Sequence, residues 1–176
     1  MNLTFSSEDI PAHFKRKRIL MVTNTPSLRV LHASFLRSQG FEYVYEAGNG
    51  MHAIDMLQVQ PIDLILADWQ LDELSGFDLM QTLRGSVTLT NVPIIMLTTK
   101  KDLPQVKETV KAKETDYLIK PFKTAQLGMK IVMTLAASEY SAPKSVTEEL
   151  QIRTIKNAMP SASIVAEQID FKKMAS

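Results

Sequence analysis

The fold of this chain is decided by the stretch Ile62-Asp63-Leu64-Ile65-Leu66-Ala67-Asp68-Trp69. The apolar residues 64–67 form a short run between two aspartates, which is typical of a strand buried on both faces in a parallel sheet. Asp68 is the first polar residue at the carboxyl end of that strand, where open α/β sheets bind their ligands. Taken alone, a strand-end aspartate favours an ordinary turn-capping role, so its significance depends on the other strands.

The remaining sequence repeats this unit of strand and helix. Further apolar runs predict strands at 19–22, 43–47, 92–97 and 117–119. Strand and helix alternate five times over residues 18–138, which implies right-handed crossovers and an α/β fold with a doubly wound parallel sheet. The helical spacing predicts these core-facing residues: Leu28, Leu31, Phe35 and Leu36 in the first helix, and Leu127, Ile131 and Leu135 in a helix over 124–137.

Composition excludes several classes of protein. Of the 176 residues 45% are hydrophobic and 22% are charged, the net charge is +1, and there is no cysteine. This balance gives no general attraction to nucleic acid or to anionic membranes, and it excludes disulfides and thiolate metal sites. The three histidines have no metal-ligand spacing. Because no apolar run approaches membrane-spanning length and no signal peptide is visible, we expect a cytoplasmic protein.

The chain divides into three parts. Residues 1–17 form an N-terminal extension that runs into the basic cluster Lys15-Arg16-Lys17-Arg18, and we expect this lead-in to be solvated. Residues 18–138 form the α/β domain. Residues 139–176 are a linker and a short helical tail, with a capping box at Ser145-x-x-Glu148, or the start of a further region. The tail is too short for a typical DNA-binding domain, and it could bind a partner or support a homodimer.

Polar residues follow four of the five predicted strands: Thr23 and Asn24, Asp68, Thr98, and Lys120. Because the carboxyl ends of parallel strands meet at one edge of a sheet, we expect these side chains to gather there. A carboxylate, a hydroxyl and an ammonium together indicate a site that handles an anion.

The segment 18–138 resembles the response-regulator receiver domain of two-component signalling, with CheY-like proteins as its simplest members. The resemblance rests on Asp68, Thr98, Tyr117 and the peptide Lys120-Pro121-Phe122, at the spacing found in that family. It implies a flavodoxin-like (βα)5 fold with strand order 2-1-3-4-5, here with a C-terminal helical extension. It also implies a cis peptide bond before Pro121.

The resemblance further implies a phosphoryl-transfer site. Asp68 would accept a phosphoryl group and Lys120 would pair with it, while Thr98 would donate its hydroxyl to the phosphoryl group and move as a switch with Tyr117. Such chemistry amounts at most to self-phosphorylation and autodephosphorylation. Mg²⁺ would be held weakly or not at all by Asp68, Asn24 and the backbone carbonyl of Gln70, with Thr23 and Thr99 also lining the pocket.

Partners follow from the same resemblance. A histidine kinase or a phosphotransfer protein would supply the phosphoryl group. A downstream protein would bind the face made by the fourth helix, fifth strand and fifth helix of the receiver, or the tail. We expect neither nucleic acid nor membrane as a partner.

One departure from the family changes the expected chemistry. Receivers carry two acidic residues after the first strand, and this chain has Thr23 and Asn24 there. Each missing carboxylate removes roughly 8 kcal/mol of gross attraction to a divalent ion, at about 4 Å and an effective dielectric of about 20. Desolvation cancels much of this, yet Mg²⁺ affinity should fall by orders of magnitude. Asp72 or Glu73, in the loop after Asp68, could supply a replacement ligand.

The sequence therefore predicts a response-regulator-like protein with a degenerate acidic pocket that acts through protein–protein contacts. The alternative is a fully functional phosphoacceptor, phosphorylated at Asp68 by a histidine kinase. A flavin-binding protein of flavodoxin type is disfavoured, because no phosphate-binding loop rich in Gly, Ser or Thr follows the first strand.

Overall fold

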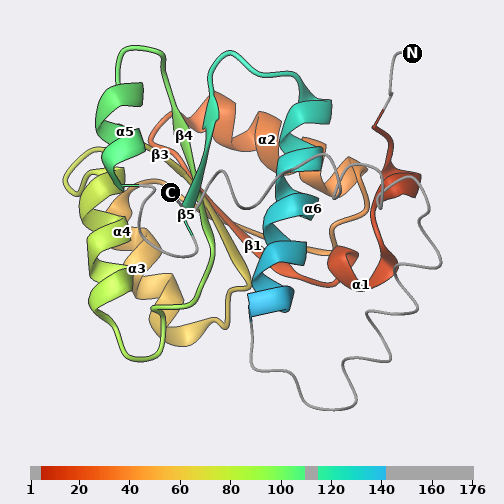
Figure 1. The fold of residues 1–176 in the computed structure, drawn as a ribbon, viewed down its shortest axis with the longest axis horizontal. Coiled ribbons are helices and arrows are strands. Elements are labelled where there is room, and N and C mark those ends of the chain that lie inside the picture. Colours follow the sequence, from red (N-terminus) through yellow and green to blue (C-terminus); the bar gives the residue numbers. More distant parts are fainter. Residues whose placement is uncertain (1–4, 110–114, 142–176) are drawn as a thin grey trace. The chain divides into compact units, whose positions relative to one another are not determined.

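The computed structural model describes residues 5–109 and 115–141 and contains one five-stranded parallel sheet (Figure 1). The strand order is β2-β1-β3-β4-β5, as the resemblance implied. Each strand is a five-residue segment, and β3 and β4 are buried along their whole length. The strands are β1 (Arg18–Val22), β2 (Tyr43–Ala47), β3 (Leu64–Asp68), β4 (Ile94–Thr98) and β5 (Thr115–Ile119).

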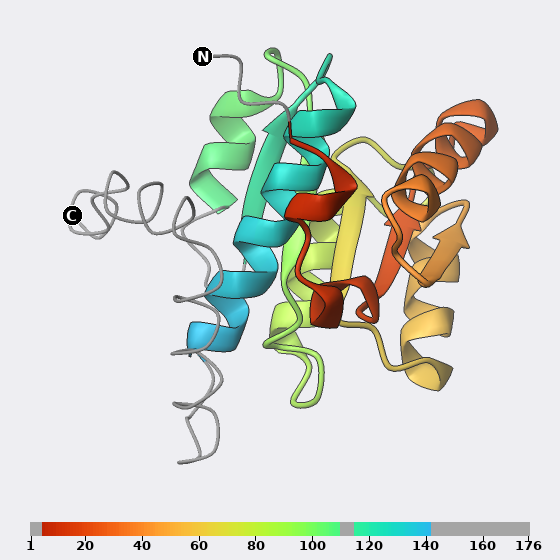
Figure 2. The same cartoon turned by 90° about the vertical axis from the view of Figure 1, so that its right-hand side faces the viewer.

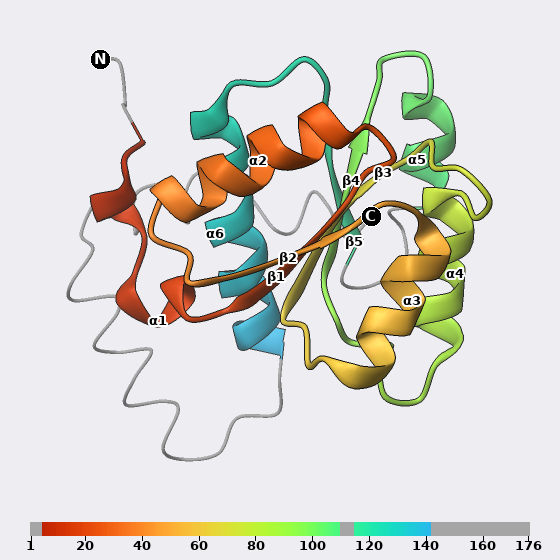
Figure 3. The same ribbon diagram turned by 180° about the vertical axis from the view of Figure 1, so that it is seen from behind.

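Helices cover both faces of the sheet, which confirms the doubly wound architecture (Figure 3). One face packs against α2 (Pro26–Ser38) and α6 (Thr124–Ser141), and the other against α3 (Gly50–Val59), α4 (Gly76–Gly85) and α5 (Leu103–Thr109). Each layer has its own apolar core. The predicted residues Leu127, Ile131 and Leu135 are buried in the α2–α6 layer. Within the part of the chain that is described, no helix is long and apolar enough to cross a membrane.

The predicted apolar face of α2 is partly wrong. Leu31 is 59% exposed, whereas His32, Ala33 and Leu36 are buried. The buried stripe is therefore rotated by about one residue, or roughly 100° around the helix. The small side chain of Ala33 is fully buried, and the polar His32 concealed this stripe from a prediction based on hydrophobicity.

The N-terminal extension is also not the solvated lead-in that was expected. It forms a 3₁₀ turn (Ser7–Asp9) and a short helix, α1 (Ala12–Lys15), beside α6 (Figure 2). Ile10 and Phe14, each 3% exposed, are buried in the same apolar cluster as the core residues of α6.

Two residues of the basic cluster, Lys17 and Arg18, form close ion pairs, whereas the side chain of Arg16 is 79% exposed, as expected. The ammonium of Lys17 lies 2.8 Å from the Glu139 carboxylate. The Arg18 guanidinium makes two hydrogen bonds to Asp63, at 2.9 and 3.0 Å. Burial opposes ionisation of Asp63, but these bonds and one from the Arg18 backbone N–H hold the pKa of that carboxyl below its ordinary value. Residues 139–141, predicted to begin the linker, belong to α6, and the rest of the predicted linker and tail lies outside the described residues.

The contact between Phe5 and Gly128 gives a first prediction. A Cβ at Gly128, inside α6, would overlap the Phe5 ring. Alanine normally stabilises a helix interior by about 1 kcal/mol relative to glycine. In a Phe5→Ala background, Gly128→Ala should therefore raise the free energy of unfolding by about that amount, whereas in the natural protein displacement of the ring should remove the gain. Urea denaturation of the four proteins measures this coupling, and an equal gain in both backgrounds would contradict the observed packing.

Candidate functional site

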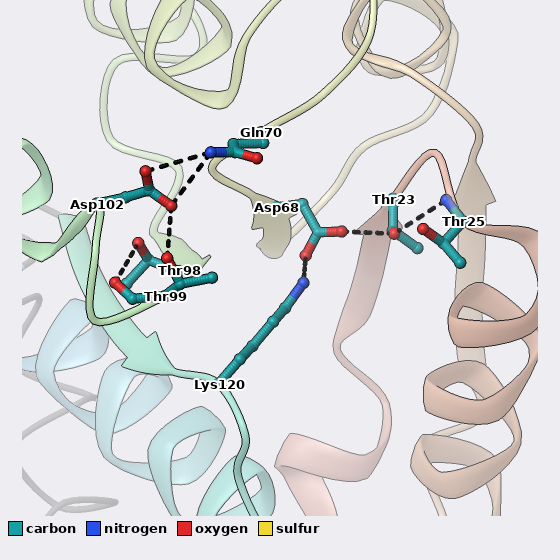
Figure 4. Close-up of polar contacts among 8 residues, drawn as sticks. All are labelled: Thr23, Thr25, Asp68, Gln70, Thr98, Thr99, Asp102 and Lys120. Carbon is teal, nitrogen blue, oxygen red and sulfur yellow. Dashed lines mark hydrogen bonds and ion pairs between the residues drawn. The ribbon is translucent and has the colours of Figure 1, made fainter.

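Asp68 ends β3 and lies at the centre of a small polar cluster (Figure 4). Its side chain is almost completely buried, with the residue 5% exposed. The Thr23 hydroxyl donates a hydrogen bond of 2.6 Å to Oδ2, and the Lys120 ammonium donates to Oδ1. Both oxygens of the Asp68 carboxylate therefore accept hydrogen bonds from side chains of the protein.

The strand register explains why these residues meet. Val22 in β1 pairs with Ala67 in β3, so Thr23 follows directly beside Asp68. In the same way Thr98 pairs with Ile119, and the next residue, Lys120, lies at the same edge. The expected convergence of Thr23, Asp68 and Lys120 is present in the structure.

Backbone contacts fix the two donors. The Arg29 guanidinium donates a 2.7 Å hydrogen bond to the Thr23 carbonyl from α2. The Lys120 backbone N–H donates a 2.6 Å bond to the Thr98 carbonyl, and the Lys120–Pro121 peptide is cis, as the resemblance implied. The Asp68 carboxylate therefore sits between two anchored side chains.

Thr98 and Tyr117, the two residues expected to act as a switch, lie on neighbouring strands. Thr98 is 1% exposed, and its hydroxyl contacts the carbonyl of Thr99 at 3.4 Å. Tyr117 is partly buried against the core, with the Lys130 ammonium 5.8 Å from its ring centroid. In this conformation the described contact of the Thr98 hydroxyl is made within its own loop.

The residues around Asp68 do not form the donor set of a typical Mg²⁺ site. Mg²⁺ prefers several hard oxygen ligands, usually including carboxylates. Here a hydroxyl and an amide occupy the positions after β1, and the positive charge beside Asp68 is that of Lys120. Across residues 5–109 and 115–141, no group of three or more His, Cys, Asp or Glu side chains is placed to hold a metal ion. Asp72 and Glu73 are exposed, and Glu73 lies 3.4 Å from the Asn49 amide.

Gln70 and Thr99 contact a residue that sequence reasoning missed. The Gln70 side-chain amide donates to both carboxylate oxygens of Asp102, at 3.2 and 3.3 Å. The Thr99 hydroxyl donates to the same carboxylate at 2.7 Å. Asp102 directly precedes α5, a position that favours aspartate. This preference is the one feature of the sequence that could have indicated a role for Asp102.

His32 is a second residue near the site that was missed. It is 9% exposed, and its ring lies 5.4 Å from that of Phe122 in the loop after Lys120. Burial lowers the pKa of His32, the charge of Asp68 acts to raise it, and the charge of Lys120 lowers it further. Its buried Nδ1 has no hydrogen-bond partner among the residues that the structure describes, in agreement with a neutral ring.

The lowered pKa of His32 predicts a pH-dependent stability. Below the ordinary histidine pKa of about 6.5 the unfolded chain takes up a proton that the folded chain resists, so stability falls as pH decreases towards the folded pKa. The limiting slope for one proton is about 1.4 kcal/mol per pH unit. His32→Leu should flatten the natural protein's stability profile below about pH 6.5. Chemical denaturation at a series of pH values measures the slope, and parallel profiles would refute the assignment.

Comparisons with known proteins agree with this geometry. A family model described as the response regulator receiver domain matches residues 19–132. Chemotaxis protein CheY-3 of Vibrio cholerae serotype O1 is 31% identical over 117 residues, which cover 66% of this chain and 90% of that protein. Chemotaxis protein CheY of Pseudomonas aeruginosa is 31% identical over 114 residues, covering 65% of this chain and 92% of that protein.

Solved structures show the same architecture. The signal receiver domain of a signal transduction histidine kinase from Syntrophus aciditrophicus matches 74% of this chain and 96% of its own, with a TM-score of 0.64 and 25% identity. Chemotaxis response regulator CheY4 of Vibrio cholerae matches 66% of this chain and 98% of its own, with a TM-score of 0.58 and 27% identity. With the sheet order, the cis Lys120–Pro121 peptide and the contact between Asp68 and Lys120, these matches show that the chain belongs to the response regulator receiver domain family of two-component signalling.

Proposed function

We propose that this chain is a receiver-type signalling module whose phosphorylation at Asp68 is weakened or lost, and which acts mainly through protein–protein contacts. The observation that carries the proposal is the double engagement of the Asp68 carboxylate by Thr23 and Lys120. Receiver domains in general bind Mg²⁺ at an acidic site and interact with kinases or phosphotransfer proteins.

The site offers little positive charge to stabilise phosphoryl transfer. In phosphoryl transfer, negative charge spread over the equatorial oxygens must be stabilised, and divalent ions usually supply much of that stabilisation. Lys120 provides one positive charge beside Asp68, and Thr23 and Asn24 lack the carboxylates that would hold a divalent ion. The oxygens of a phosphoryl group arriving at this carboxylate would therefore have the ammonium of Lys120 beside them and no firmly held metal ion to coordinate them.

The contacts of the Asp68 carboxylate also reduce its nucleophilicity. A carboxylate oxygen that accepts a short hydrogen bond has less electron density available for attack on phosphorus. Thr23 donates to Oδ2 at 2.6 Å, and Lys120 holds Oδ1. Since separating a buried ion pair leaves an uncompensated charge, we expect the pair of Asp68 and Lys120 to persist. The paired state partly reproduces the neutralised carboxylate of a metal-bound receiver.

The surface made by α5, β5 and α6 is the proposed contact with a downstream protein. Met129 and Met133 lie one turn apart on α6 and are 40% and 37% exposed. Methionine adapts readily to different partners, and exposed pairs of this kind suit a protein interface. Lys130, between them in sequence, forms an ion pair of 2.7 Å with Asp116 of β5. The tail beyond Ser141 remains the second proposed contact.

A working phosphoacceptor is the second candidate, and one observation favours it. Asp68 and Lys120 are in contact, and Thr98 ends the neighbouring strand, so the three residues to which the resemblance assigns phosphoryl transfer are all present. In that case a histidine kinase or a phosphotransfer protein would phosphorylate Asp68.

Fluorescence of Trp69, the only tryptophan and the neighbour of Asp68, separates the two candidates. The natural protein and Asp68→Asn are titrated with Mg²⁺ and then with beryllofluoride, a mimic of the phosphoryl group. Under the proposal both proteins give a flat response through millimolar Mg²⁺. A saturable response in the natural protein that disappears in Asp68→Asn would instead establish the phosphoacceptor.

A further inference from the structure

Asp102 carries a buried negative charge that the proposed function does not use. It is 8% exposed, yet the hydrogen bonds to its carboxylate come from two neutral groups, the Thr99 hydroxyl and the Gln70 amide. Within the described ranges no lysine, arginine or histidine forms an ion pair with it. A buried carboxylate without a cation depends on its hydrogen bonds, so these contacts constrain the groups that make them.

The contacts of Asp102 join the two loops that border Asp68. Gln70 is two residues after Asp68 in the loop between β3 and α4, and Asp102 is four residues after Thr98 in the loop between β4 and α5. The backbone N–H groups of Asp102 and Leu103 both donate to the Thr99 carbonyl, at 3.2 and 3.1 Å. Residues 98–103 therefore form a compact turn, and the bonds from Gln70 to Asp102 connect this turn to the loop between β3 and α4.

This turn contains the residue that the Thr98 hydroxyl contacts. The Thr98 hydroxyl contacts the Thr99 carbonyl at 3.4 Å, and Figure 4 places Thr98 beside Thr99, on the Asp102 side of Asp68. A backbone movement of 99–102 that brought this hydroxyl closer to a group bound at Asp68 would strain the bonds from Thr99 and Gln70 to Asp102.

We propose that Asp102 is a positioning residue that, through Thr99 and Gln70, holds the loop after β4 in the conformation in which Thr98 faces away from Asp68. The inference rests on the proposed function, because it concerns regulation of the same site. The side-chain bonds from Gln70 and Thr99 to Asp102 form a clamp. Its loss shifts the loop equilibrium towards the conformation in which Thr98 can reach a ligand at Asp68.

The first test needs no ligand. Gln70→Leu removes both bonds from the amide, leaves the backbone carbonyl in place, and changes an exposed side chain, so the fold is retained. Thr99→Val removes the remaining side-chain bond, and exposed Lys101→Ala in the same loop serves as the control. Hydrogen–deuterium exchange of the amides in 98–103 should become about tenfold faster in both clamp variants and remain unchanged in the control. Unchanged exchange in both clamp variants would overturn the inference.

The second test separates this inference from the proposed function. Gln70→Leu is placed in a Thr23→Asp/Asn24→Asp background, in which the acidic pair is rebuilt, and beryllofluoride is titrated in the presence of Mg²⁺. Loss of the clamp should increase the affinity for beryllofluoride about tenfold. In the variant, a smaller part of the free energy of binding is needed to move the loop. Equal affinity with and without Gln70 would refute the positioning role. A response in the natural protein that is lost in Asp68→Asn would instead count against the proposed function while leaving the clamp intact.

Discussion

Replacing both Thr23 and Asn24 by aspartate is expected to raise the affinity of the site for Mg²⁺ by at least ~100-fold. The two new carboxylates each contribute roughly 8 kcal/mol of gross attraction at about 4 Å and an effective dielectric of about 20. Desolvation and mutual repulsion cancel most of that, and a net gain of about 3 kcal/mol already corresponds to a factor of about 100. The variant also removes the hydroxyl that Thr23 now donates to Asp68 Oδ2.

Isothermal titration calorimetry with Mg²⁺ measures this gain. The matched control is Thr25→Asp/Ser27→Asp, which adds the same charge at two exposed positions at the start of α2. The control should bind Mg²⁺ as weakly as the natural protein. Equal affinities for the two double variants would mean that the identity of residues 23 and 24 does not limit metal binding.

Gly76→Ala is expected to destabilise the protein by about 3 kcal/mol, at the upper end of the usual cost of overpacking. The added Cβ would overlap the backbone carbonyl oxygen of Asp68 and lie 2.6 Å from Cε of Met96. The Asp68 backbone cannot easily retreat, because neighbouring Trp69 donates a 2.9 Å hydrogen bond to Leu97 and accepts a 3.0 Å bond from Gly76 itself. This glycine lets α4 begin directly against the end of β3.

Gly85→Ala provides the matched control in the same helix. No atom lies within 4 Å of a Cβ added there, so the variant should be neutral or more stable by up to about 1 kcal/mol. Urea denaturation compares the two variants, and the Trp69 emission of folded Gly76→Ala reports whether the site is displaced. Similar stabilities for the two variants would contradict the close approach of α4 to Asp68.

The sheet and the centre of the site could be predicted from the sequence because both follow from simple periodicity. The apolar run 64–67 is long enough for one buried strand, and the polar residue after it must emerge at the carboxyl edge. Once five such strands lie parallel, Thr23, Asp68 and Lys120 reach the same edge whatever the details of the loops. Their convergence at this edge could therefore be predicted without knowledge of side-chain packing, whereas the hydrogen bond from Thr23 to Asp68 could not.

Other features could not be predicted, because they depend on tertiary contacts that leave no periodic pattern. Ile10 and Phe14 are isolated apolar residues in a polar segment, and only the docking of that segment beside α6 buries them. His32 is a polar residue on the buried side of α2, which is why Leu31 was wrongly assigned to the core. The bonds from Gln70 to Asp102 join two loops whose conformations local sequence does not determine.

The most direct test of the central claim is chemical phosphorylation with a small acyl-phosphate donor. The natural protein, Thr23→Asp/Asn24→Asp and Asp68→Asn are incubated with acetyl phosphate and Mg²⁺, and each is examined by intact-protein mass spectrometry. The proposed function predicts that the natural protein and Asp68→Asn keep their unmodified mass, while the variant with the acidic pair gains one phosphoryl group. A phosphoryl adduct on the natural protein that is absent from Asp68→Asn would contradict it and establish Asp68 as a working phosphoacceptor.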